Sequence, residues 1–319
     1  MLIAAALLAG VLADRLLGEP RRFHPLVGFG NLASALEARL NTHPGQRGLA
    51  LLKGAVALVL LVVPLGLASA LLWWWLVAQV PLLALAFGAV VLYASLGWRS
   101  LEEHVRDVDS ALAQSLPAGR AAVQHIVSRD CAAMDESQVV RASLETLLEN
   151  TSDAIVGPLF WFTLLGPAGA LVYRLSNTLD AMWGYRSARF NYFGRAAARW
   201  DDLLNLVPAR LTALAFALVG DTASALGSWR RFARHWASPN AGPVICAGSG
   251  ALNISLGGGA CYQGQWETKP ATCGRPATRA DIGRALALVR RAVLLLLVSF
   301  IVVSGIFALA DTLLNGVSL

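Results

Sequence analysis

Residues 145–158 read Glu145-Thr-Leu-Leu-Glu-Asn-Thr-Ser-Asp-Ala-Ile-Val-Gly-Pro158, and they lead into an apolar block, residues 154–173, that Gly157-Pro158 and Gly166-Pro167 interrupt. A second polar cluster, Ser176-Asn-Thr-Leu-Asp180, follows the block. Proline removes a helix hydrogen bond, and irregular backbone at membrane depth is tolerated only inside protein or beside a wet cavity. Carboxylates beside membrane-type sequence are costly and usually functional. The stretch therefore predicts a broken helix with a site at its ends.

The composition of the chain indicates an integral membrane protein. Hydrophobic residues make up 56% of the 319 residues and charged residues 14%, whereas an ordinary soluble domain carries about 25% charged residues. The net charge of +6 is almost all arginine, which suits both the anchoring of cytoplasmic loops and the binding of phosphate or carboxylate. A basic balance in such a chain is no sign of nucleic-acid binding. The four cysteines form no CxxC pair, so neither a zinc site nor a disulfide framework is expected.

Four apolar segments are long and continuous enough to predict helices: residues 1–13, 54–79, 80–98 and 292–314. The first lacks the basic start of a signal peptide, so it is expected to be an uncleaved helix. The next two are joined so closely that they predict a helical hairpin, with Trp73-Trp74-Trp75 as an interfacial anchor. Residues 203–220 are less regular, because they contain Pro208 and Arg210. We predict an all-α polytopic integral membrane protein with about four secure spans, one or two broken or re-entrant helices, and helical cytoplasmic loops.

Arginine counts predict the topology. The hairpin places loops 15–53 and 99–153 on one side, and their arginines indicate the cytoplasm. A full crossing by residues 154–173 would put loop 174–202, which holds five arginines, outside. A re-entrant block avoids this violation and leaves loops 15–53, 99–153, 174–202 and 221–291 on the cytoplasmic side of a single membrane-embedded domain, residues 1–319.

The loops themselves are expected to be largely helical. Apolar residues recur at helical spacing in 99–153, and an amphipathic helix is expected around Ile282–Arg291. Ser238–Gly242 and Gly248–Gly259 predict a glycine-rich loop. Its backbone N–H groups could hold a phosphate, although tight packing inside the membrane is an equally good interpretation.

The acidic stretch of the opening sequence has two interpretations. Arg141, Glu145 and Glu149 recur at i,i+4, so they share one helix face, and Asp153 continues it if the helix does. Hard carboxylate oxygens in such a row can hold Mg²⁺ beside a phosphate. An ordinary Arg–Glu ladder on a solvated helix, or a cap for the next segment, would look the same. The polar residues next to an apolar entry favour the site.

Several separate motifs, in order, together resemble one family. They are Asp14-Arg15-x2-Gly18-Glu19-Pro20 with His24-Pro25, Arg129-Asp130, Glu145-Thr-x2-Glu-Asn-Thr-Ser-Asp153, Gly157-Pro158-x-Phe160, Asn177-Thr178-x-Asp180-x-Met182, Phe193-Gly194-x4-Arg199-x-Asp201-Asp202, Asn205-x2-Pro208-x-Arg210, Ser238-Pro239-Asn240-Ala241-Gly242, and Gly257-Gly258 with Tyr262. With them, the chain resembles the CobD/CbiB family of adenosylcobinamide-phosphate synthases. Glu19 stands where the family more often has aspartate, which keeps the carboxylate.

The resemblance implies a late step of cobalamin (vitamin B12) biosynthesis. An ATP-dependent carbon–nitrogen ligase of this kind would join the carboxylate of adenosylcobyric acid, a corrinoid, to the amine of (R)-1-amino-2-propanol phosphate or aminopropanol, with ATP and Mg²⁺ as cosubstrate and metal. Other late cobalamin-pathway enzymes at the membrane are a further class of partner. The expected location is the cell inner (cytoplasmic) membrane, with many passes and the active site facing the cytoplasm.

The resemblance also distributes roles over the polar residues. The candidate metal ligands are Glu149, Asp153, Asp180 and Asp201. The candidates for phosphate and substrate carboxylate are Arg129, Arg186, Arg199 and Arg210. The candidates for orienting the nucleotide or the amide groups of the corrinoid are Asn150, Thr151, Asn177 and Asn240. Further substrate-binding candidates are Asp14, Gly257 and Gly258. Glu145 or His24 could act as the general base for the ammonium, and the sequence does not choose between them.

Two other functions remain alternatives at this point. A non-enzymatic membrane sensor of the AmpE type is similar in outline, but we expect it to lack most of the acid–amide motifs that this chain keeps. A transporter built on broken helices would place charges at the midplane and show an inverted repeat, and neither is visible here.

Overall fold

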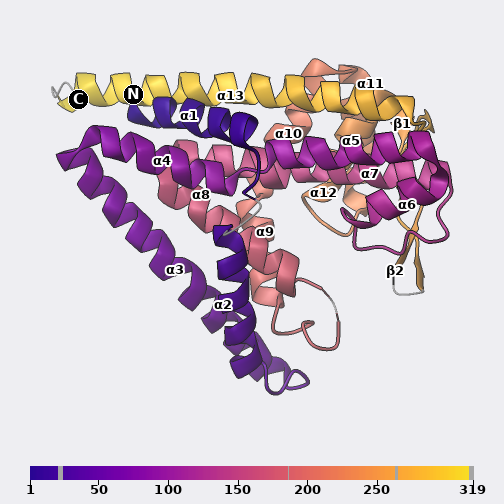
Figure 1. Cartoon of the computed structure of the whole chain (residues 1–319), viewed down its shortest axis with the longest axis horizontal. Helices are drawn as coiled ribbons and strands as arrows, with labels where there is room; N and C mark the ends of the chain where they lie inside the picture. The colour runs from indigo at the N-terminus through magenta and orange to yellow at the C-terminus, as the bar shows by residue number, and fades with distance from the viewer. Residues whose placement is uncertain (21–23, 186, 263–264, 316–319) are drawn as a thin grey trace. The chain divides into compact units, whose positions relative to one another are not determined.

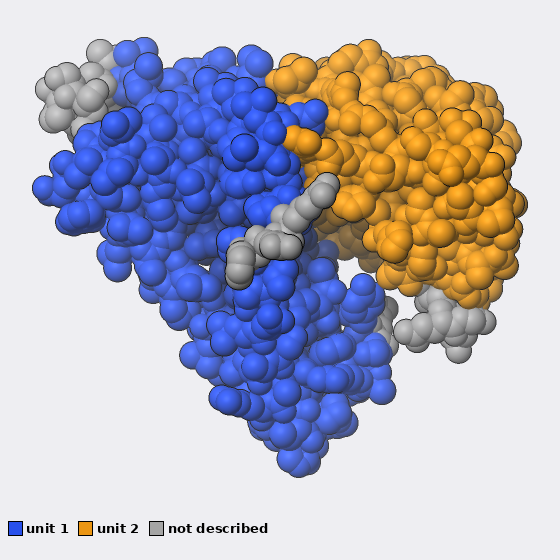
Figure 2. All heavy atoms as spheres, viewed as in Figure 1, with its two compact units in different colours: residues 1–97, 157–205, 297–319 blue, residues 98–156, 206–296 orange. Residues whose placement is uncertain are grey.

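The computed structural model describes residues 1–20, 24–185, 187–262 and 265–315, and most of them are helical (Figure 1). The chain divides into two compact units (Figure 2). Unit 1 comprises residues 1–97, 157–205 and 297–319, and unit 2 comprises residues 98–156 and 206–296. The chain passes between the units four times, at the breaks after Gly97 and Asn205, at the junction of η1 and α8, and inside α13.

Unit 1 is built from helices. They are α1 (Leu2–Leu17), α2 (Pro25–Leu40), α3 (Arg47–Gln79), α4 (Pro81–Ser95), α8 (Gly157–Trp183), α9 (Arg195–Leu204) and the second part of α13 (Ala280–Asn315). Helices α3 and α4 meet at Val80, which confirms the predicted hairpin. The sixteen residues of α1 extend about 24 Å, less than the roughly 30 Å of a bilayer core. This helix packs on α4, where Gly10 lies against Leu92.

Unit 2 combines helices with two very small sheets. Its helices are α5 (Trp98–Gln114), α6 (Leu116–Gln124), α7 (Glu136–Thr151), the π turn η1 (Ser152–Val156), α10 (Leu206–Val219), α11 (Thr222–Phe232), the 3-10 turn η2 (Ala233–His235), α12 (Ala241–Leu252) and the start of α13. Strand β1 (Ile254–Ser255) pairs in parallel with β4 (Arg275–Pro276), and β2 (Ala260–Tyr262) pairs antiparallel with β3 (Gln265–Glu267). Helices α5, α6 and α7 confirm the helical reading of residues 99–153.

Four helical segments of the described chain are long and apolar enough to cross a membrane: Arg47–Gln79, Pro81–Gln114, Glu136–Trp183 and Ala280–Ala310. Helices α9 and α10 make a fifth if they count as one broken span. The protein is therefore a multi-pass membrane protein. The predicted irregularity at 203–220 is confirmed, since the helix is interrupted at Asn205. Pro208 lies in the first turn of α10, where a missing N–H breaks no helix bond.

The apolar block of the opening sequence folds back on itself. Gly166 has φ 61° and ψ −151°, and it divides α8 into two arms. A Cβ atom at Gly157 would lie 2.1 Å from Cζ of Tyr173, although a straight helix would separate these residues by about 24 Å. The tip of this helical hairpin lies against Trp73, whose Nε1 is 3.5 Å from a Cβ built at Gly166. A hairpin brings the chain back to the side from which it entered.

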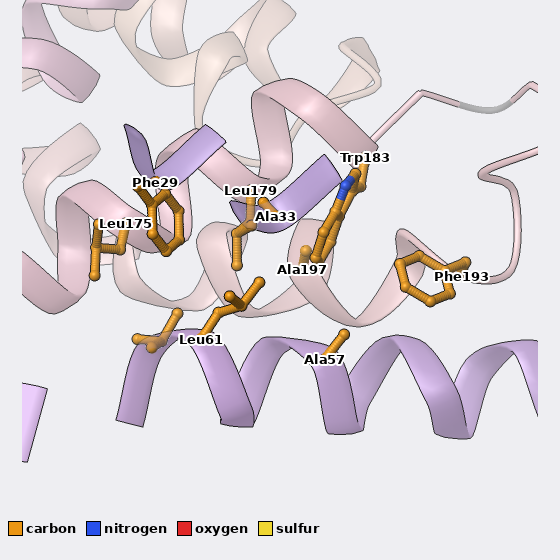
Figure 3. Close-up of a cluster of buried hydrophobic side chains, with 10 residues drawn as sticks. Phe29, Ala33, Ala57, Leu61, Leu175, Leu179, Trp183, Phe193 and Ala197 are labelled. Carbon is orange, nitrogen blue, oxygen red and sulfur yellow. The ribbon is translucent and has the colours of Figure 1, made fainter. Parts of the chain in front are cut away.

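A buried cluster in unit 1 fixes α8 and α9 against α2 and α3 (Figure 3). Leu175, Leu179 and Trp183 recur every fourth residue on α8 and enter the cluster together. The Trp183 ring meets Phe193 edge to face, with centroids 5.1 Å apart, a geometry that adds about 1 kcal/mol beyond burial. The other side of α8 is left for the polar residues of the second cluster.

The prediction of a glycine-rich loop from Ser238–Gly242 and Gly248–Gly259 is wrong where the two stretches enter helix α12 (Ala241–Leu252), and there the alternative of tight packing holds. All twelve of its residues are buried, as expected of a helix that is apolar on every side. Its glycines allow close approach: a Cβ at Gly242 would lie 2.5 Å from Ala233 O, and one at Gly250 would lie 2.4 Å from Ser224 O. The loop proper is limited to the residues between α12 and β2.

A pH-sensitive ion pair joins α2 to the segment between α8 and α9. Arg189 donates to both carboxylate oxygens of buried Glu37, and Asn41 donates to Oε1 at 2.7 Å. Burial raises the pKa of Glu37, but the hydrogen bonds from Arg189 and Asn41 and the Arg189 charge together lower that pKa below its ordinary value of 4.5.

This pair predicts a loss of stability in acid. Because the folded pKa of Glu37 is below the unfolded value, its contribution is present above pH 4.5 and disappears as the pH falls through the folded pKa. Between about pH 5 and pH 3, the melting temperature of R189Q should therefore fall less steeply than that of the parent protein. R39Q, which removes an exposed arginine from the same helix, is the control. Parallel curves for the parent and R189Q would contradict the assignment.

Candidate functional site

The acid–amide cluster of unit 1 lies where α8 packs on α9. Asn177 Nδ2 donates to Asp201 Oδ1 at 3.4 Å, and Arg174 Nη1 donates to Asn177 Oδ1 at 3.5 Å. The carboxylate of Asp201 interacts electrostatically with Asp180, so the sequence motifs around residues 177–180 and 199–202 are brought together. Asp201 is buried, and Asp180 is partly buried. Several negative charges held this close require a cation or protons to balance them.

Local backbone geometry makes room for Asp180. Its carbonyl accepts a hydrogen bond from Gly184 N at 2.6 Å as α8 ends. A Cβ at position 184 would lie 2.1 Å from Asp180 Oδ1, so only glycine lets the carboxylate occupy this place. On α9, Trp200 Nε1 donates to Ser176 Oγ at 3.1 Å and fixes the contact between the two helices.

The donor set of this cluster fits Mg²⁺ only in part. Among the residues that the structure describes, no three His, Cys, Asp or Glu side chains are grouped closely enough to hold a metal ion. Magnesium is usually held by one or two carboxylates together with substrate phosphates and water. Asp180 and Asp201 could supply those carboxylates, and the remaining ligands would come from the substrate side.

Glu145, in unit 2, is a buried carboxylate with both oxygens occupied. Oε2 accepts from Arg129 Nη2 at 2.8 Å, and Oε1 accepts from the backbone N–H of Gly257 at 2.8 Å. Glu145 is 2% exposed and Arg129 is 8% exposed. The pair thus anchors the turn after α12 to α7. The geometry gives Glu145 a positioning role.

The i,i+4 spacing allowed an ion pair between Arg141 and Glu145. In the structure Glu145 pairs with Arg129 instead. Arg141 extends instead toward the glycine turn, and its Nη2 approaches Gly259 O at 3.5 Å. Gly257 and Gly258 have φ values of +87° and +92°, which favour glycine. A Cβ at Gly258 would lie 3.1 Å from Arg141 Nη1, so the guanidinium lies directly over the turn.

The rest of the opening stretch forms the end of α7 and the π turn. Asn150 Nδ2 donates to Thr146 O at 3.0 Å, and Thr151 Oγ1 donates to Leu147 O at 2.7 Å, so both side chains bond to their own helix. Glu149 and Asp153 are partly buried. The π turn precedes Pro158, which has no N–H for the carbonyl four residues earlier. Such turns occur frequently at functional sites.

Two further candidates of unit 2 meet directly. Arg210 Nη1, on α10, donates to Asn240 Oδ1 at 2.6 Å, just before α12 begins. Asn240 is 5% exposed, so the bond joins a buried amide to a partly buried guanidinium. This bond connects two motifs thirty residues apart in the sequence.

The remaining predicted residues lie apart from these contacts. His24 caps α2, with Nδ1 accepting from Leu26 N at 3.2 Å, and its Nε2 is 3.8 Å from Glu19 Oε1. Asp14 is buried in α1. Arg199 is exposed on α9 and acts electrostatically on Asp202. Arg186 lies outside the described residues.

Sequence reasoning missed two participants. Asp202 acts electrostatically on both Asp180 and Asp201, and it was not among the predicted site residues. Gln138 lines a cavity beside Arg129 and Arg141, and in the structure its side chain also forms a capping box with Asp135. Of the four predicted metal ligands, Glu149 and Asp153 belong to unit 2, and Asp180 and Asp201 belong to unit 1.

Known proteins supply an independent comparison. The family model described as CobD/Cbib protein matches residues 7–289. "Cobalamin biosynthesis protein CobD" of Chromobacterium violaceum is 51% identical over 286 residues, which cover 88% of this chain and 90% of that protein. The proteins of the same name from Stutzerimonas stutzeri and Geobacter metallireducens are 49% and 39% identical, over 85% and 87% of this chain and 87% and 88% of theirs. No solved structure is significantly similar to the chain.

Proposed function

Because the chain belongs to the CobD/Cbib protein family, we propose that it is the ATP-dependent ligase that joins adenosylcobyric acid to (R)-1-amino-2-propanol phosphate and forms adenosylcobinamide phosphate. The observation that carries the proposal is the match over residues 7–289. This range includes every residue that the sequence assigned to the site. The names of the relatives support cobalamin biosynthesis, and the reaction itself is our inference.

The proposed chemistry needs activation, because a carboxylate does not condense with an amine in water. The substrate carboxylate would attack the terminal phosphorus of ATP, release ADP and become an acyl phosphate. The amine would then displace phosphate and form the amide, and a base would take the ammonium proton. Mg²⁺, when bound, would offset the charge on the phosphate oxygens. Asp180 and Asp201, where α8 packs on α9, are the proposed protein ligands, and the substrate phosphates and water would supply the others.

The general base is better assigned to His24 than to Glu145. Both oxygens of Glu145 already accept hydrogen bonds, one from the Arg129 guanidinium and one from the Gly257 backbone, so neither is directed at a substrate. His24 Nδ1 accepts from a backbone N–H, so the proton of a neutral ring is on Nε2, next to Glu19. The ring would take up the ammonium proton at Nδ1 after the bond from Leu26 N opens, and the Glu19 carboxylate beside Nε2 would then balance the imidazolium charge.

A direct assay tests the function. Purified protein in detergent should convert ATP, Mg²⁺, adenosylcobyric acid and aminopropanol phosphate into the amide, detected by mass spectrometry, with one ADP formed per amide. Omission of ATP or addition of a chelator should stop the reaction. Binding of the substrates without any amide product would favour a sensor of the AmpE type. Movement of a substrate across the membrane, with no amide formed, would favour a transporter.

The proposed location is the cytoplasmic membrane, with the site facing the cytoplasm. The folding back of α8 returns the chain to its side of entry, which would keep the arginines of residues 174–202 with those of the other basic loops. In a C273S background, which removes an exposed thiol, A188C should resist a membrane-impermeant maleimide in right-side-out sealed vesicles. Q79C, at the turn between α3 and α4, should react as the positive control. Labelling of A188C before lysis would contradict this topology.

A further inference from the structure

Unit 2 contains a small cavity in which a few charged and polar side chains lie among apolar ones. Its volume is about 80 Å³, and its lining consists of Arg129, Asp130, Ala133, Met134, Gln138, Arg141, Gly259, Ala260, Cys261 and Trp266. One water molecule occupies about 30 Å³ in the liquid, so the cavity has room for a few waters or one tetrahedral oxyanion, but not for a nucleoside triphosphate. It lies between α7 and the turn and hairpin that follow α12.

Three charged side chains line the cavity, those of Arg129, Asp130 and Arg141, and it is Arg141 that favours an anion. Glu145 neutralises Arg129 and holds it in place. Asp130 is exposed, and its Oδ1 accepts from Ala132 N at 3.0 Å. Arg141 forms no ion pair within the described part of the chain, and its buried Nε lacks a hydrogen-bond partner there. Burying an N–H donor on a guanidinium that has no ion pair costs folding free energy. An oxyanion can accept two parallel hydrogen bonds from the planar N–H groups of a guanidinium.

The glycine turn provides access for such a ligand. Because positions 257–259 carry no side chains, the guanidinium of Arg141 lies against bare backbone at Gly258. The bond from Gly257 N to Glu145 fixes the turn beside the arginines. One wall is therefore backbone, and the opposite wall is the polar face of α7.

We propose that this cavity binds the phosphate group of a small phosphate monoester, with Arg141 as its main cation and the Arg129–Glu145 pair as the group that positions the turn. The proposal rests on the proposed function, in which the amine substrate carries such a phosphate. The same side chains could bind the terminal phosphate of ATP, although the whole ATP molecule is too large for the cavity. The test therefore compares the two sources.

Cys261 provides a reporter that does not depend on turnover. Its thiol lines the cavity and is partly accessible, whereas Cys131 and Cys246 are buried. In C273S protein, the rate of Cys261 alkylation by iodoacetamide is measured by peptide mass spectrometry with inorganic phosphate, aminopropanol phosphate, aminopropanol or ATP, without corrinoid. We expect inorganic phosphate and aminopropanol phosphate to slow alkylation, and aminopropanol and ATP to leave the rate unchanged. Protection by ATP alone would overturn the monoester assignment, and no protection by any phosphate would overturn the site.

Two variants test the role of Arg141. R141Q should raise the half-protecting concentration of aminopropanol phosphate by about tenfold to a hundredfold, since charge-assisted bonds are lost. Q138E should act in the same direction while preserving the fold, because glutamate can replace glutamine in the capping box with Asp135. R291Q, an exposed arginine on α13, is the control for lost charge. Unchanged protection in Q138E and R141Q would overturn the assignment.

Amide formation by the same preparations separates the two proposals. Turnover without protection of Cys261 would overturn the phosphate site and leave the ligase. Protection without turnover would overturn the ligase and leave an anion site. Protection that R141Q abolishes, together with a raised KM for aminopropanol phosphate and an unchanged KM for ATP, would support both.

Discussion

D201N is expected to reduce the rate of amide formation by about 10³-fold, since a carboxylate that holds Mg²⁺ on phosphate contributes several kcal/mol to the transition state. The change is nearly isosteric, and the new amide oxygen can still accept the bond that Asn177 donates. The melting temperature should therefore stay close to that of the parent protein. The rate is measured by ADP release coupled to amide product at saturating substrates.

The matched control for D201N is D107N, which removes an exposed carboxylate from α5 and should leave the rate unchanged. Raising the Mg²⁺ concentration should recover part of the D201N activity if the lost group is a metal ligand. Near-normal turnover by D201N at low Mg²⁺ would remove Asp201 from the site.

E145A is expected to lower the stability of the protein by about 3–5 kcal/mol, because it leaves the buried Arg129 guanidinium without its anion. It also removes the acceptor that holds Gly257 N. Thermal unfolding in detergent, followed by circular dichroism, should show a melting temperature lower by several degrees. The effect is large because both partners of the pair are almost fully buried.

E103A is the matched control for E145A. Its carboxylate also pairs with an arginine, Arg99, but the two side chains are 51% and 37% exposed, so its loss should cost less than about 1 kcal/mol. The double variant R129M/E145L removes both charges and should be more stable than E145A. Equal melting temperatures for E103A and E145A would contradict the structural role of the buried pair.

The local features of the fold could be predicted from the sequence. Apolar length identified α3, α4 and α13, and the Gly-Pro breaks with the arginine count identified a chain that turns back within α8. These predictions succeeded because each depends on one segment and on general costs, such as a missing N–H or a misplaced positive charge. The glycine-rich stretch failed for a related reason. Glycine content alone does not distinguish a loop from a helix packed closely on every side, and α12 is such a helix.

The partners of the polar residues were decided by tertiary structure. Spacing allowed Arg141 to pair with Glu145, yet the fold supplies Arg129 to Glu145 and places Arg141 over Gly258. The pairing of these charged side chains depends on how α7, the glycine turn and the segment before α7 pack together. Residue spacing along one helix does not predict that packing. The sequence by itself therefore determined the membrane class, the family and the kinds of side chain available to a site, because these depend on composition and motif order. The pairing of the buried charges, and the cavity that this pairing leaves beside Arg141, depend on three-dimensional packing, because a buried arginine is stabilised by whichever acceptor the fold brings within reach.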